Sequence, residues 1–266
     1  MNTYRKVALS AICGFVLSAT SMVFAEEDSP MPKVTDGFRY VLTPYMWMPG
    51  VSGPVYHNNT KIGDLNMSNG QVLDSLSIGA MLNGTVYYER WGIMGNATYA
   101  KLRPSGTSSY QQGVNVDTDT TFWLGIYTVA GTYTAYASDS VFLDVLAGAR
   151  FLNLNVKTAL KGTVAATGYS ADTTVYTQYN TTNPVAGVQG RIRMGESQFF
   201  VPFYLDVGGA SQNSTFNSQQ ILGIGYTYKN IDTLLVYNNV YYKMNKDNFS
   251  ARLDMGGPAI ATTFRF

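Results

Sequence analysis

Side-chain polarity alternates with a period of two residues in many separate stretches of this 266-residue chain. Between residues 76 and 89, the even positions carry mainly apolar side chains and the odd positions carry mainly small or polar ones. The same alternation runs through residues 184–194 and 199–207. Because successive side chains of a β-strand point to opposite faces of a sheet, each stretch is predicted to be a strand with one apolar and one polar face.

The connections between these segments fall into two classes. The turns after the second, fourth, sixth and eighth segments have two or three residues, whereas the other connections are mostly longer and rich in Asn, Ser, Thr, Tyr and Gly. Short periplasmic turns that alternate with longer extracellular loops are typical of outer-membrane barrels. We therefore predict an all-β fold, a closed antiparallel transmembrane β-barrel of about ten strands. Eight or twelve strands remain open, because the first and ninth segments alternate poorly. The segments are 38–50, 76–89, 91–103, 119–137, 140–156, 184–195, 198–210, 217–228, 231–243 and 254–266, and the longer connections are 51–75, 104–118, 157–183, 211–216 and 244–253.

The composition agrees with a membrane barrel and argues against other classes. Charged residues make up 13% of the chain, about half of the roughly 25% that is usual in soluble domains. Beyond the first 25 residues no apolar run is long enough for a transmembrane helix, and a formal net charge of +1 gives no electrostatic footprint for nucleic acid. Aromatic residues gather near both ends of the segments, as expected for two interfacial girdles. A soluble β-sandwich is the alternative, and it would have to cover both strand faces with very few charges.

The first 25 residues have the features of a secretory signal peptide. Arg5 and Lys6 precede an apolar stretch at 7–16, and Val23 and Ala25 occupy the −3 and −1 positions of a cleavage site. We predict a signal peptide at 1–25, a periplasmic N-terminal segment at 26–37 and the barrel at 38–266. Cleavage removes Cys13, the only cysteine, so disulfides and thiol chemistry are excluded from the predicted mature chain.

Two further patterns resemble known outer-membrane proteins. The last strand ends on Phe266, which resembles the C-terminal assembly signal of Gram-negative outer-membrane barrels. Residues 45–53 read Tyr-Met-Trp-Met-Pro-Gly-Val-Ser-Gly and resemble the Y-x-W-x-P-G-x-x-G opening of a poorly characterised family of proteobacterial outer-membrane barrels, whose pattern residues 73–76 and 88–95 also match. The resemblance implies this fold and a place in the outer membrane, and that family has no agreed activity. The expected partners are outer-membrane lipid and lipopolysaccharide, periplasmic chaperones and the barrel-assembly machinery.

The chain offers few groups for catalysis. His57 is the only histidine and lies in the first long connection, where a single histidine is more often solvated than a general base. No nucleophile elbow, phosphate-binding loop or His/Cys metal spacing is present. We therefore expect no enzymatic activity, no cofactor and no metal. The omptin proteases, which are also ten-stranded barrels, share only the predicted strand count with this chain.

Polar residues on the inner faces of the fifth, sixth and seventh segments are predicted to line the lumen. Asp144 and Arg191 each lie about five residues from a short turn, on neighbouring strands, and are expected at similar depth, roughly 15 Å from the periplasmic rim. One interpretation is that these ions pair inside a narrow lumen and hold the barrel together. The other is that a basic stripe lines a small anion-favouring pore. A buried arginine without an acid is costly, which favours pairing. The predicted lumen-lining residues are Asp144, Arg150, Gln189, Arg191, Arg193, Tyr204 and Asp206.

The longer connections carry two further signals. Ser68 and Gln71 have the spacing of a capping box, with Met67 and Val72 placed as a hydrophobic staple, so a short helix over 69–76 is predicted to close the barrel mouth or lie across its rim. Tyrosines stand among small polar residues, a composition that suits adaptable contact surfaces. These tyrosines are Tyr56, Tyr110, Tyr169, Tyr176 and Tyr179.

The leading functional hypothesis is a non-enzymatic integral outer-membrane protein with a structural role or a narrow passage for small solutes. The alternative is a surface-exposed adhesin or ligand-binding protein that acts through its extracellular loops.

Overall fold

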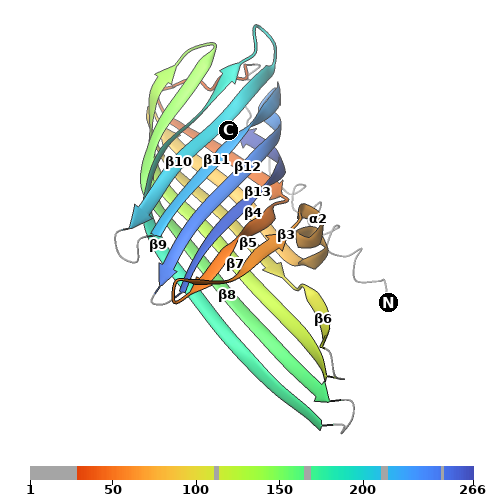
Figure 1. The fold of residues 1–266 in the computed structure, drawn as a ribbon. Coiled ribbons are helices and arrows are strands. Elements are labelled where there is room, and N and C mark those ends of the chain that lie inside the picture. Colours follow the sequence, from red (N-terminus) through yellow and green to blue (C-terminus); the bar gives the residue numbers. More distant parts are fainter. Residues whose placement is uncertain (1–28, 111–113, 165–168, 211–214, 247–248) are drawn as a thin grey trace.

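Ten antiparallel strands close into a barrel, because β1 pairs with β4 on one side and with β13 on the other (Figure 1). The computed structural model describes residues 29–110, 114–164, 169–210, 215–246 and 249–266, and the predicted signal peptide lies outside them. The predicted ten-stranded closed barrel is confirmed. Its strands are β1 (Phe38–Trp47), β4 (Leu76–Tyr88), β5 (Trp91–Leu102), β7 (Val114–Ala137), β8 (Val141–Val164), β9 (Tyr169–Arg193), β10 (Phe199–Ala210), β11 (Thr215–Tyr228), β12 (Ile231–Lys246) and β13 (Phe249–Arg265).

The alternation in the sequence corresponds to the two faces of the barrel wall. On β4 the even-numbered side chains are exposed on the outer surface, whereas Thr85 and Tyr87 are buried inside. The outer surface is a belt of exposed apolar side chains, such as Ile93, Leu222 and Leu235. No α-helix in the part of the chain that the structure describes could span a bilayer.

Aromatic rings border this belt beside the short turns. Trp91 packs against Tyr133 with ring centroids 4.7 Å apart, and Phe199 packs against Tyr226 at 4.9 Å. Each pair joins neighbouring strands. Rings at this level match the headgroup region of a bilayer, so the short-turn end lies at one membrane interface.

The prediction that residues 51–75, 104–118, 157–183 and 244–253 are loops is wrong for most of their length. β2 (Gly50–His57) and β3 (Thr60–Met67) form a hairpin that continues the wall along β13. β6 (Ser105–Tyr110) pairs with the first part of β7, and β7, β8 and β9 are 24, 24 and 25 residues long. Figure 1 shows these strands extending as a ribbon beyond the barrel. Where both faces of a sheet meet water, polar side chains can occupy every position, so no alternation marks the strands.

The wall is interrupted where β1 gives way to β2. Pairing between β1 and β4 ends at Pro44 and Leu82. Three residues further on, the backbone N–H of Trp47 donates to Met81 Sδ at 3.1 Å instead of to a carbonyl of β4. Beyond this point β1's place beside β13 is taken by β2, which pairs with β3 and not with β4.

Helix α2 (Asn69–Ser75) links β3 to β4 across this interruption. The predicted capping box is confirmed: the Gln71 N–H donates to Ser68 Oγ at 3.3 Å, and the Ser68 N–H donates to Gln71 Oε1 at 2.8 Å. Asn69 also donates from Nδ2 to the Met48 carbonyl at 2.5 Å. The helix therefore ties down the chain where the strand pairing changes, and Figure 1 shows it beside β3 at the flank of the barrel.

Candidate functional site: the barrel lumen

The outer half of the lumen is filled by an apolar cluster. Trp47 from β1 is buried here, and its indole Nε1 donates to the Asn238 carbonyl of β12 at 3.1 Å. A satisfied indole N–H allows the ring to be buried without an unpaired donor. We call the buried members of this set the apolar cluster, and they are Trp47, Ile126, Leu152, Tyr179, Val240, Tyr242, Met244, Ala251, Leu253, Met255 and Ala259.

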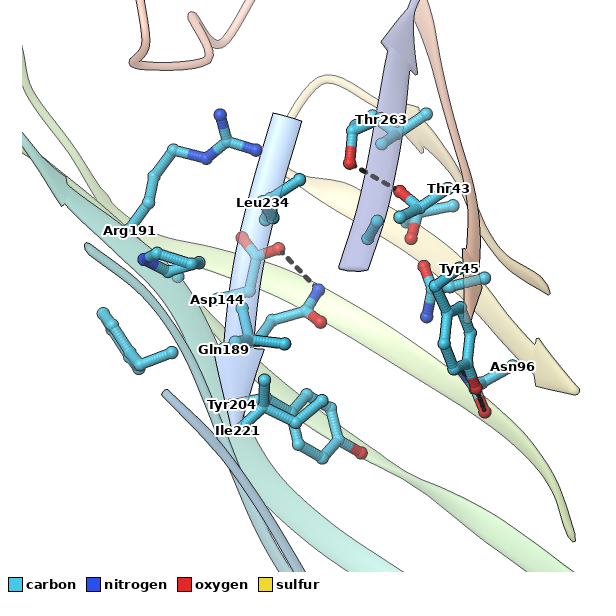
Figure 2. Close-up of a pocket in the computed structure, with 18 of the residues that line it drawn as sticks. Thr43, Tyr45, Asn96, Asp144, Gln189, Arg191, Tyr204, Ile221, Leu234 and Thr263 are labelled. Atoms are coloured by element: carbon cyan, nitrogen blue, oxygen red, sulfur yellow. Dashed lines mark hydrogen bonds between the residues drawn. The ribbon is translucent and has the colours of Figure 1, made fainter. Parts of the chain in front are cut away.

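A cavity of about 220 Å³ lies in the lumen on the periplasmic side of this cluster. Every barrel strand except β7 contributes to its lining. Figure 2 shows polar side chains that face it from opposite walls, among them Asp144, Gln189 and Arg191 on one side and Thr43 and Tyr45 on the other. Apolar side chains such as Ile221 and Leu234 complete the lining, so the cavity is amphipathic.

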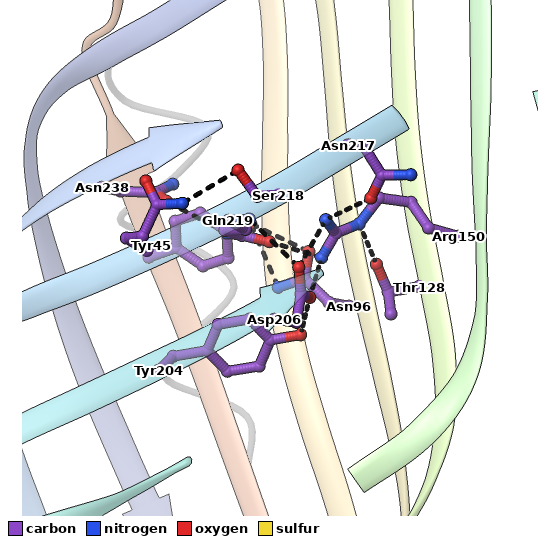
Figure 3. Close-up of polar contacts among 11 residues, drawn as sticks. Tyr45, Asn96, Thr128, Arg150, Tyr204, Asp206, Asn217, Ser218, Gln219 and Asn238 are labelled. Carbon is purple, nitrogen blue, oxygen red and sulfur yellow. Dashed lines mark hydrogen bonds and ion pairs between the residues drawn. The ribbon is translucent and has the colours of Figure 1, made fainter. Parts of the chain in front are cut away.

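Arg150 is the centre of a buried polar network between the apolar cluster and the cavity (Figure 3). Its Nη1 donates to Asp206 Oδ1 at 3.0 Å and to Asn217 at 3.1 Å, and its Nη2 donates to Asp206 Oδ2 and to Gln219 at 2.8 Å. Nε donates to Thr128 at 3.0 Å. All five N–H groups of the guanidinium are therefore satisfied.

Asp206 is equally well partnered. Besides its two bonds from Arg150, it accepts hydrogen bonds from the Tyr204 hydroxyl and from the Gln219 backbone N–H, the latter at 3.1 Å. Arg150 and Asp206 are 1% exposed. This bidentate pair joins β8 to β10 over the inner face of β9, the strand between them.

Asp144 lies deeper toward the periplasm and is held by neutral donors. Its carboxylate accepts from the Tyr87 hydroxyl at 2.7 Å, the Thr134 hydroxyl at 2.8 Å and Gln189 Nε2 at 3.2 Å. The side chains of Asp144 and Gln189 are directly opposed on β8 and β9, which places them together without a cation.

Arg191 pairs with Asp232 of β12, at 2.9 Å, and not with Asp144. Arg265 of β13 lies 3.3 Å from the other oxygen of the same carboxylate. Asp232 is fully buried and also accepts the Thr227 hydroxyl at 2.7 Å. Two guanidinium groups thus share one carboxylate at the periplasmic end of the lumen.

The structure places six of the seven predicted residues in these networks. Arg193 is the exception: its guanidinium donates to the carbonyls of Glu196 and Ser197 in the β9–β10 turn, at 2.9 Å each, and it does not line the cavity. Sequence reasoning missed Asp232 and Arg265. Arg265 is on the inward face of an alternating segment, a signal that could have identified it, whereas Asp232 is inward in the ninth segment, where alternation is poor.

The described chain begins inside the periplasmic mouth. Arg265 Nη1 donates to the Ser29 carbonyl and Arg191 Nη1 donates to the Pro30 carbonyl, both at 2.9 Å. Met31 is 2% exposed and packs with Phe142 and Phe200, and Pro32 lines the cavity. Residues 29–32, which we call the N-terminal plug, therefore close this end of the lumen.

His57, at the end of β2, is exposed. Within the described ranges no group of three His, Cys, Asp or Glu side chains could hold a metal ion. The polar networks inside the barrel instead join strands and surround the cavity.

A closed barrel with an apolar outer belt, aromatic rings at an interface and a polar lumen defines a transmembrane β-barrel of the outer-membrane type. Comparison with protein-family models finds no match, and no curated protein sequence matches the chain. Among solved structures, the outer-membrane protease OmpT of Escherichia coli aligns over 88% of this chain and 99% of its own, with a TM-score of 0.55 and 9% identity. At this identity the likeness shows the fold alone.

Two other similar structures have lower scores. Ail of Yersinia pestis, an attachment invasion locus protein, aligns over 87% of this chain and 100% of its own, with 14% identity and a TM-score of 0.33. The toluene transporter TodX of Pseudomonas putida aligns over 87% and 90%, with 8% identity and a TM-score of 0.38.

Proposed function

We propose that this chain is a non-enzymatic protein of the Gram-negative outer membrane whose lumen is a narrow passage for a small solute. The observation that carries the proposal is the cavity of about 220 Å³ inside the barrel. A cavity needs about 10–15 Å³ to hold one water molecule, so this one has room for several waters or one small solute. Passage toward the outside requires the apolar cluster to move, which makes this a closed state of the passage.

The proposal includes no catalytic step. A general base must stand within hydrogen-bond reach of the group it deprotonates, and His57 is on an exposed hairpin end instead of in the lumen. We expect His57→Ala to leave every measured property of the barrel unchanged. A hydrolytic activity lost in that variant would contradict the proposal.

Solute permeation tests the passage. Purified protein is inserted into liposomes, and swelling is followed in isosmotic solutions of small sugars, amino acids and salts. Ile221→Trp fills the cavity from β11, whereas Leu222→Trp, the matched control one residue along, adds the same ring to the lipid-facing surface. We expect swelling faster than in protein-free liposomes, slowed by Ile221→Trp and unchanged by Leu222→Trp. Swelling at the protein-free rate for every solute would refute the passage.

A second candidate function is binding at the cell surface, favoured by the length of three strands. A transmembrane β-strand needs about 9–11 residues, and β7, β8 and β9 have 24 or 25. Lys157 and Tyr176 are register partners in the extension, so residues 158–175 can be replaced by a two-residue turn between them. If this ribbon binds a surface ligand, the shortened protein folds normally and loses attachment to cells or glycans; unchanged attachment contradicts binding through the ribbon.

A further inference from the structure

We infer that the N-terminal plug occupies a binding site for a small oxyanion, a phosphate or carboxylate group, formed by Arg191 and Arg265 at the periplasmic end of the cavity. The inference rests on the proposed function, and it names the class of solute and the element that closes the site. In the closed state, two carbonyl oxygens of the plug take positions that the oxygens of an anion would take.

The two guanidinium groups are held in place from inside the wall. Asp232 contacts both, at 2.9 Å from Arg191 and 3.3 Å from Arg265. Arg191 also lies over the Phe200 ring, with Cζ 4.4 Å from the centroid, and Arg265 Nη2 donates to the Lys229 carbonyl at 2.9 Å. These contacts orient the arginines without the plug, so the site is preformed.

Within residues 29–32, the groups bonded to the two arginines are backbone carbonyls, which are neutral acceptors. The Ser29 and Pro30 carbonyls each accept one guanidinium N–H at 2.9 Å. Hydrogen bonds from arginine to a charged oxygen are roughly twice as strong as those to a neutral one. A small anion that reaches the mouth can therefore replace both carbonyls and retain the same donors.

The charge around the cavity favours an anion. Arg39, Arg191 and Arg265 line it, as does Asp144, and Asp232 is bound to two of these arginines. Guanidinium groups therefore outnumber carboxylates among the side chains that line the cavity. Asp144 is bonded by three neutral donors, and Arg191 forms its ion pair with Asp232 instead.

Met31 provides the attachment that an anion must displace. Its side chain is 2% exposed and packs with Phe142 and Phe200, next to Arg191. The apolar contact of Met31 holds the plug in the periplasmic mouth, and the plug carbonyls accept hydrogen bonds from Arg191 and Arg265. Binding of an anion and docking of the plug are thus mutually exclusive, and each lowers the occupancy of the other.

Thiol labelling at position 31 tests this competition directly. In a Cys13→Ser background, Met31→Cys carries one buried thiol, and Thr35→Cys is the matched control because Thr35 is exposed in the same segment. Folded protein in detergent micelles is labelled with a maleimide in rising concentrations of inorganic phosphate, of acetate, or of sodium chloride at equal ionic strength. The rate of thiol modification reports how often the plug leaves the mouth.

We expect the cysteine at position 31 to react at least about tenfold more slowly than the one at position 35 without an anion. If an anion binds only when the plug is released, the released state gains a factor of one plus the ratio of anion concentration to its dissociation constant. Phosphate or acetate at about ten times that constant should accelerate labelling at position 31 about tenfold and leave position 35 unchanged. The anion that acts at the lower concentration identifies phosphate or carboxylate as the preferred group.

Arg191→Gln in the Met31→Cys protein should abolish the acceleration, because Asp232 keeps its partner Arg265 while the site loses one cation. Labelling that is equally fast at positions 31 and 35, or that is insensitive to both anions, overturns the inference. If labelling responds to anions but no solute permeates, the anion site is supported and the passage is refuted. If solute permeates but labelling does not respond to anions, the passage is supported and the anion site is refuted.

Discussion

The Arg150–Asp206 pair provides the sharpest test of how the lumen is stabilised. Asp206→Asn keeps the shape of the side chain but removes the charge that faces a fully buried guanidinium. Breaking a buried ion pair by removing one partner costs about 3–5 kcal/mol, because an uncompensated charge stays buried. Arg150 retains its bonds to Thr128, Asn217 and Gln219. Each oxygen of Asp206 accepts two hydrogen bonds, so the amide NH2 of an asparagine there faces two donors, and the loss arises from the removed charge together with these unsatisfied donors.

Urea unfolding in detergent micelles, followed by tryptophan fluorescence and by the heat-dependent gel shift, measures the effect. With a slope of about 2 kcal/mol per molar urea, the Asp206→Asn midpoint should fall by roughly 2 M. Asp254→Asn is the matched control, because Asp254 is exposed on the outer face of β13. The double variant Arg150→Met with Asp206→Leu removes both charges and should regain most of the loss, since apolar replacement of a buried pair is often neutral. A midpoint like that of the control, or a double variant less stable than Asp206→Asn, would refute the reasoning.

Three further predictions concern the wall and the helix. Leu222→Lys puts a charge on the lipid-facing surface and should cost about 2–4 kcal/mol in unfolding from lipid vesicles if Leu222 lies near the bilayer midplane, whereas Val175→Lys, at an exposed position of the extension opposite Thr158, should have no effect. Gly53 has φ of +146°, and a Cβ there would lie 1.8 Å from the Arg252 carbonyl oxygen; Gly53→Ala should therefore speed hydrogen exchange in the β2–β3 hairpin, while Gly63→Ala, with open space around it, should not. Ser68→Ala removes the cap of α2 and should cost the helix about 1 kcal/mol, seen as faster amide exchange confined to α2; exchange that spreads through the barrel would contradict a purely local role.

The barrel could be predicted from the sequence because its two solvents differ sharply. Successive residues of β4 and β10 face lipid on the outside and the polar lumen on the inside. Apolar and polar side chains therefore alternate at 76–88 and 199–207. The short turns were predictable for a similar reason, since two or three polar residues between alternating segments permit only a hairpin. The helix at 69–75 was found because a capping box is a local signal that needs no tertiary contact.

The strands outside the membrane could not be found in this way. The hairpin of β2 and β3 and the outer parts of β7, β8 and β9 lie between aqueous surfaces, where polarity need not alternate. These strands are stabilised by backbone pairing with strands that belong to the barrel. This pairing is a tertiary contact, so it leaves no local pattern in the sequence. The break at Met48 and Pro49 likewise depends on which neighbour β13 takes on either side of it.

The ion pairs show where sequence reasoning about depth is insufficient. Counting residues from the turns places Asp144 and Arg191 on neighbouring strands, and in register Asp144 does lie opposite Gln189, two residues from Arg191. An arginine side chain is long enough to leave its own strand pair and cross a narrow lumen, where Arg191 meets Asp232 on β12. Which carboxylate it meets is set by closure of the barrel between β1 and β13, since closure brings β12 and β13 round to face β9. The same closure brings Arg265 of β13 close to Arg191 of β9, so that both guanidinium groups contact Asp232 at the periplasmic end of the lumen. The sequence of either strand alone does not predict this arrangement.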